Sequence, residues 1–103
     1  MELTLNADDN GLPGEVLARW HTTNLADFGT CCQLMTAKAS TGIPVSADTT
    51  YWIVVRTKIK NMGTYDVWNN DYNDVQGPTA VNHGHGWVDG GIQVQGAFGV
   101  FGQ

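Results

Sequence analysis

The chain has 103 residues, a length that fits one domain. Ten acidic residues against five basic ones give a net charge of −5. This charge disfavours nucleic acid and anionic membranes, because both are bound through clustered Lys and Arg. No apolar stretch is long enough to span a bilayer, so membrane insertion is not expected.

Strands are predicted wherever apolar and polar residues alternate between turn-forming residues. In chain order they cover 2–6, 15–21, 31–38, 50–58, 64–69, 86–88 and 92–101. Breakers separate them at 40–42, 61–63, 77–78 and 89–91, and longer loops are expected at 23–29 and 70–82. A strand and turn about every ten residues is typical of a sandwich or small barrel. We therefore predict one all-β domain over residues 1–103, an antiparallel β-sandwich that is jelly-roll-like.

The first two strands are joined by a turn-rich segment, residues 8–14, in which Asn10-Gly11 is followed by Pro13-Gly14. Asn-Gly supplies two positive-φ positions and Pro-Gly a fixed φ, so the segment predicts a strand-turn-strand unit. The apolar run 51–55 occupies both faces of its strand and favours a central position in the sheet.

Cys31 and Cys32 are the two cysteines of the chain, and they are adjacent. Neighbouring strand residues point to opposite faces, which places the two thiols poorly for a mutual disulfide. The pair therefore does not reveal the redox compartment.

Four segments stand in a characteristic order: Asp9 to Ala18, Ala47 to Val55, Gly86-Trp87, and Phe98 to Gly102. Together they resemble the bacterial choice-of-anchor domains, in which a DNGxPGxxL turn precedes a TTYWLVV strand. The resemblance covers most of the chain and implies a non-enzymatic, jelly-roll-like extracellular β domain. It places the protein in the secreted or cell-surface fraction, with the leader and the anchor outside this chain.

Such domains usually have further strands before the turn hairpin, whereas here the chain begins in the strand just before it. Missing N-terminal strands would leave an edge whose unpaired backbone groups invite another copy. We therefore expect a homo-oligomer that associates through exposed edge strands.

Aromatic residues beside a polar stretch offer the most plausible binding surface. Aromatic faces stack on the apolar faces of sugars, and neighbouring amides, carboxylates or imidazoles bond the hydroxyls. The predicted glycan-binding residues are Trp68, Tyr72, His83, His85 and Trp87. The alternative is that the four tryptophans fill the core, and this is what we expect for Trp20 and Trp52.

Two segments carry candidate metal ligands. His83 and His85, spaced by two, suit a zinc site, but further ligands would have to come from elsewhere, and exposed loop histidines are the simpler interpretation. Residues 6–11 place Asn, Asp and Gly as in a calcium loop, yet Leu17 stands where the bidentate Glu belongs. Turn residues are the better explanation of this segment and of the second oxygen-rich stretch, 69–74. We expect no metal and no cofactor.

The sequence contains no nucleophile elbow and no phosphate-binding loop. We therefore expect a non-catalytic surface or adhesion domain with weak carbohydrate association. The alternatives are a purely structural self-associating module and a small metal-dependent hydrolase.

Overall fold

The computed structural model describes residues 1–22, 34–56 and 73–102. Five strands form two antiparallel sheets: β1 (Glu2–Asp9), β2 (Leu12–His21), β3 (Tyr51–Arg56), β4 (Gln76–Asn82) and β5 (Trp87–Val94). The described residues include no helix, so the all-β prediction is confirmed, and the two sheets are compatible with a β-sandwich. A search of the same residues finds no helix that could cross a membrane.

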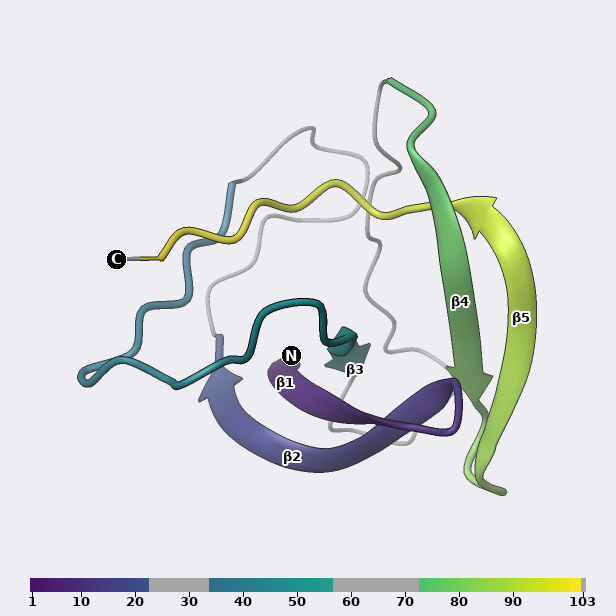
Figure 1. The fold of residues 1–103 in the computed structure, drawn as a ribbon, viewed down its shortest axis with the longest axis horizontal. Coiled ribbons are helices and arrows are strands. Elements are labelled where there is room, and N and C mark those ends of the chain that lie inside the picture. Colours follow the sequence, from purple (N-terminus) through teal and green to yellow (C-terminus); the bar gives the residue numbers. More distant parts are fainter. Residues whose placement is uncertain (23–33, 57–72, 103) are drawn as a thin grey trace.

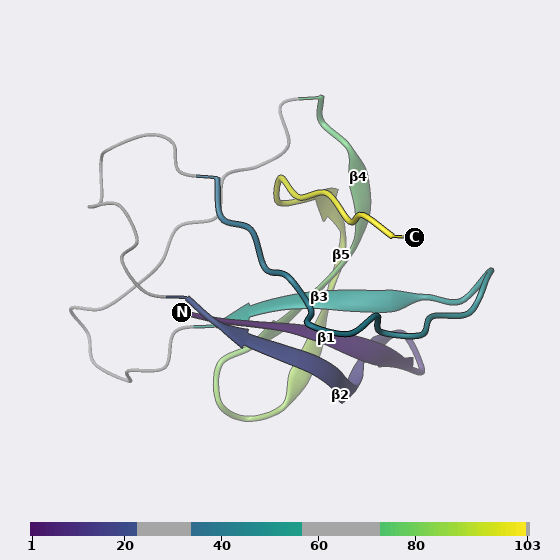
Figure 2. The ribbon, with the colours of Figure 1, turned by 90° about the vertical axis from the view of Figure 1, so that its left-hand side faces the viewer.

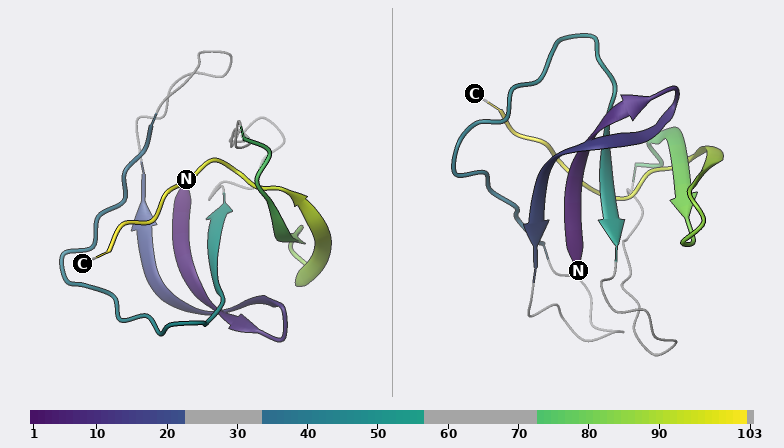
Figure 3. Two further views of the ribbon diagram at one scale, coloured as in Figure 1. Left: turned by 45° about the horizontal axis from the view of Figure 1, so that its top comes forward. Right: turned by 90° about the horizontal axis from the view of Figure 1, so that it is seen from below.

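The larger sheet has the strand order β2-β1-β3, and Figure 3 shows these strands side by side. The β1–β2 turn consists of Asn10 and Gly11, whose φ angles of 52° and 86° are those that a two-residue hairpin loop requires. This confirms the predicted strand-turn-strand unit. The turn is shorter than expected, however, because Pro13 and Gly14 already lie in β2.

Two bulges bend β2. Asn6 pairs with Val16 while Asp8 pairs with Pro13, so an extra β2 residue is accommodated opposite Ala7. A second irregularity at Leu17 separates the Leu5–Ala18 pair from the Asn6–Val16 pair. Bulges increase local bend and twist, and the strong curvature of β2 is evident in Figure 1.

The polar face of β1 is more deeply buried than its apolar face. Glu2, Thr4 and Asn6 are 1%, 4% and 4% exposed, whereas Leu3 and Leu5 on the other face are half-buried. Among the described residues, no aliphatic or aromatic side chain other than Pro13 reaches full burial. The position of β1 between two strands with long side chains, among them two arginines and a tryptophan, accounts for the burial of its polar residues.

The second sheet is the β4–β5 ribbon, which stands at a steep angle to the larger sheet (Figure 2) and contacts it through β2 and β5. The predicted loop 70–82 is wrong over 76–82, because these residues form β4. Pro78 is accommodated there opposite Ile92 in a ribbon of two strands, where a missing N–H is tolerated.

The predicted break at 89–91 is a bulge inside β5. Thr79 pairs with Gly91 and Ala80 with Asp89, which leaves Gly90 without a register partner. The predicted strands 86–88 and 92–101 are therefore one strand, Trp87–Val94, and 97–101 lie outside any strand.

Two further expectations need correction. Residues 34–38 of the predicted strand 31–38 are not in a strand, and 31–33 lie outside the described residues. The apolar run Tyr51–Arg56 does form a strand, but β1 rather than β3 is central among the described strands. The apolar run is explained by partial cover, since Tyr51 to Val55 are all half-buried. The predicted strand 64–69 lies outside the described residues.

Candidate functional site

The predicted glycan-binding residues fall into two groups. Trp68 and Tyr72 lie outside the described residues. His83 and His85 are exposed in the β4–β5 connection, and Trp87 is half-buried at the start of β5. The structure therefore places three of the five predicted residues at one hairpin end.

That hairpin end is shaped by two glycines. The φ angle is 100° at both Gly84 and Gly86, and the amide of Gly84 donates a hydrogen bond to Asn82 Oδ1 at 2.8 Å. In the part of the chain that the structure describes, no three His, Cys, Asp or Glu side chains lie close enough to hold a metal ion together.

The suggested calcium segment has its oxygens engaged by the protein. Asn6 Oδ1 accepts from the hydroxyl of Thr4 at 2.6 Å. Asp8 accepts the Trp52 indole N–H at 2.8 Å through Oδ1 and the Gly11 amide at 3.3 Å through Oδ2. These hydrogen bonds support the interpretation of this segment as a structural turn.

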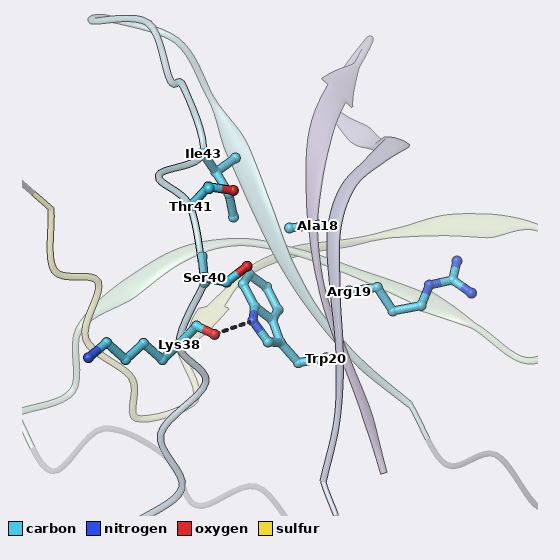
Figure 4. Close-up of a pocket in the computed structure, with 8 residues that line it drawn as sticks. Ala18, Arg19, Trp20, Lys38, Ser40, Thr41 and Ile43 are labelled. Atoms are coloured by element: carbon cyan, nitrogen blue, oxygen red, sulfur yellow. Dashed lines mark hydrogen bonds between the residues drawn. The ribbon is translucent and has the colours of Figure 1, made fainter.

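A pocket of about 330 Å³ lies elsewhere, between β2 and the segment that precedes β3 (Figure 4). Three β2 residues form one wall, and the segment around the bend at Ser40 and Thr41 forms the other. The lining residues are Ala18, Arg19, Trp20, Lys38, Ala39, Ser40, Thr41 and Ile43.

Trp20 dominates this pocket. Its indole N–H donates to the carbonyl oxygen of Lys38 at 3.2 Å, which fixes the ring beside Ser40. Trp20 is half-buried, so part of the ring is accessible. The expectation that Trp20 and Trp52 are core residues is not met, since both are half-buried, and Trp52 bonds the exposed Asp8.

The pocket combines an aromatic surface, two hydroxyl side chains and the apolar side chains of Ala18, Ala39 and Ile43. Such a lining can stack a flat apolar ligand face and exchange hydrogen bonds with ligand hydroxyls. The charged ends of the two cations point elsewhere: in Figure 4, Lys38 and Arg19 extend away from the indole. Nothing in the local pattern near Trp20 signals this pocket, because its second wall comes from residues about twenty positions later.

No protein-family model, curated protein or solved structure matches this chain. The resemblance to choice-of-anchor domains therefore stays a prediction.

Proposed function

We propose that this chain is a non-catalytic, jelly-roll-like domain of a secreted or cell-surface protein that associates weakly with carbohydrate through the Trp20 pocket. The observation that carries the proposal is the half-buried indole of Trp20, held by its bond to the Lys38 carbonyl. A ring fixed in this way presents its surface without losing rotational freedom when a ligand binds.

The chemistry of the second wall supports a hydroxyl-rich ligand. Ser40 and Thr41 each offer one donor and two acceptor positions, and both are exposed. The volume of about 330 Å³ is at the lower end of the range for small-molecule sites. A pocket that covers one side of a ligand gives weak binding, as expected for a module that acts in several copies.

Two tryptophan variants test the proposal. The full chain would be titrated with neutral oligosaccharides while intrinsic fluorescence and acrylamide quenching are recorded. We expect Trp20→Ala to weaken glycan binding at least tenfold and Trp87→Ala to leave it within twofold, with both variants folded by far-UV circular dichroism. Loss in Trp87→Ala alone would instead assign binding to the hairpin end, and no response of the wild-type chain to any glycan would refute carbohydrate association.

Self-association is the second candidate function, and exposed apolar side chains favour it. Val88 and Ile92 on β5 are 65% and 66% exposed, and Val100 and Phe101 near the C-terminus are 73% and 96% exposed. Isolated exposed apolar residues are ordinary, but several on neighbouring segments mark contact surfaces.

Light scattering during size-exclusion chromatography tests this second candidate. An associating chain should increase in mass with concentration, and the double variant Val88→Thr/Ile92→Thr should lower that mass. The matched control is Val45→Thr, which changes another exposed valine (60% exposed) away from β5. A mass equal to one chain at every concentration would contradict self-association.

A further inference from the structure

Both arginines of the chain meet on the face of the larger sheet opposite Trp20. Arg56 is the register partner of Glu2 on β3, and His21 is its register partner on β2. Arg19 lies two residues before His21 and points to the same face. The alternation of strand side chains therefore brings three basic residues around one carboxylate.

The carboxylate is buried and the basic groups are not. The Glu2 side chain is 2% exposed, whereas Arg19, His21 and Arg56 are 48%, 50% and 59% exposed. Arg56 Nη2 forms an ion pair with Glu2 Oε1 without the alignment of a hydrogen bond. Arg19 Nη1 and His21 Nδ1 stand 3.7 Å and 3.8 Å from Glu2 Oε2, which is beyond hydrogen-bond distance.

This arrangement leaves some N–H donors of the two arginines without a partner on Glu2. Each guanidinium has five N–H donors in a planar fork, and one buried carboxylate cannot engage them all. Two arginines against one glutamate leave the cluster positively charged in a chain whose net charge is −5.

We propose that Arg19, His21 and Arg56 form a binding site for an oxyanion group, the sulfate or carboxylate of an acidic saccharide. Glu2 is the positioning residue: it draws the three basic side chains together from two strands and contacts no ligand. A guanidinium fork binds planar or tetrahedral oxyanions in a bidentate manner and keeps its charge at any physiological pH. The saccharide part of the ligand rests on the proposed function, whereas the site lies on the other face of the sheet: Arg19 borders the Trp20 pocket, but its charged end extends away from the indole toward Glu2.

The test uses three probes on the full chain at constant ionic strength: a sulfated disaccharide, the same disaccharide without sulfate, and inorganic sulfate. Affinities would be measured by calorimetry. We expect the sulfated disaccharide to bind at least tenfold more tightly than the other two probes. Equal affinity of the sulfated and neutral disaccharides would overturn the oxyanion site. Inorganic sulfate binding as tightly as the disaccharide would overturn its assignment to a saccharide.

The variants Arg19→Lys and Arg56→Lys keep the positive charge beside Glu2 but remove the fork. Each should weaken the sulfated probe at least fivefold while the far-UV spectrum is unchanged. Val100→Glu is the control for charge, because it makes the net charge more negative by one at a residue that is 73% exposed and belongs to neither candidate binding site, and it should change affinity less than twofold. An equal loss in Val100→Glu would show general charge attraction and refute the site.

Trp20→Ala separates this proposal from the previous one. It should weaken binding of the neutral disaccharide at least tenfold and change the affinity of the sulfated disaccharide less than twofold. A loss of sulfated-disaccharide binding in Trp20→Ala would place oxyanion recognition at the pocket and overturn the assignment to the two arginines.

Discussion

The buried carboxylate of Glu2 predicts an asymmetry between two substitutions of the same ion pair. Replacement of Arg56 by Met leaves a charge whose side chain is 2% exposed, whereas replacement of Glu2 by Gln leaves arginines that are about half exposed and can be hydrated. A buried charge that loses its ion-pair partner lowers the free energy of unfolding far more than an exposed charge that loses its partner. Arg56→Met should therefore destabilise the protein more than Glu2→Gln.

The magnitudes follow from the burial of each partner. Removal of one partner from a buried pair costs about 3–5 kcal/mol, and the remaining Arg19 and His21, 3.7 Å and 3.8 Å from Glu2 Oε2, place Arg56→Met near the lower end. Loss of a charge-assisted contact with half-exposed partners costs about 1 kcal/mol. The difference of about 2 kcal/mol is about a 30-fold change in the unfolding equilibrium constant.

Urea unfolding followed by circular dichroism measures both variants. The double variant Glu2→Gln/Arg56→Met should be more stable than Arg56→Met alone, because it removes the stranded charge. Lys38→Met, at an exposed position, is the control for loss of one positive charge and should stay within about 0.5 kcal/mol of the parent. Equal destabilisation by Glu2→Gln and Arg56→Met would refute the reasoning.

Three further predictions test the larger sheet by urea unfolding. Gly11→Ala should cost about 1 kcal/mol, because φ is +86° although no atom lies within 4 Å of the new Cβ; an unchanged midpoint would contradict the turn geometry. Gly14→Ala should cost about 1–3 kcal/mol, since its Cβ would stand 2.8 Å from the Cβ of Asp9. Gly42→Ala is the control and should be neutral, because no atom lies within 4 Å of its new Cβ. Similar costs for the two substitutions would argue against the close approach of β1 and β2. Trp52→Phe loses the 2.8 Å indole bond to an exposed carboxylate and should cost about 1 kcal/mol or less; a larger loss would show that Trp52 is a core residue after all.

The sequence predicted the elements that short-range rules determine. Alternation located β1 and β2, and an apolar run located β3. The Asn-Gly pair located the β1–β2 turn, because the turn needs two positive φ angles that few residue pairs supply. The β4 strand was not predicted, because Gly77 and Pro78 ordinarily interrupt a strand when only neighbouring residues are considered. Their tolerance depends on the partner strand, which local rules do not include.

The Trp20 pocket could not be predicted by the same means. Its walls are joined by the bond between the Trp20 indole and the Lys38 carbonyl, 18 residues apart in sequence. Periodicity assigned Trp20 to the apolar face of its strand, which is correct, since Trp20 pairs with Leu3 and Ala18 with Leu5. The extent to which that face is covered depends on where the segment before β3 lies, and the sequence of β2 does not determine where that segment lies.

The burial of Glu2 also depends on distant parts of the chain that a local sequence pattern does not include. Glu2, Thr4 and Asn6 share one face of β1, and the polar face of an alternating strand ordinarily lies toward solvent. The central position of β1 reverses that arrangement, because neighbouring strands contribute long side chains on both sides. Position within the sheet therefore decides burial here more strongly than residue type.

The bulges in β2 determine which of its residues face each of the two candidate sites. They shift the register at residues 14–17, so that Val16 pairs with Asn6 on the polar face while Ala18 and Trp20 face the pocket. A slip of one residue would exchange the faces of Arg19 and Trp20, which the alternation of a strand makes unavoidable. The bulges and the Asn10-Gly11 turn fix that register, and with it an indole on one face and two arginines on the other. Because the sheet separates the two faces, a substitution at Trp20 should leave the affinity for the sulfated probe unchanged, and a substitution at Arg56 should leave the affinity for the neutral sugar unchanged.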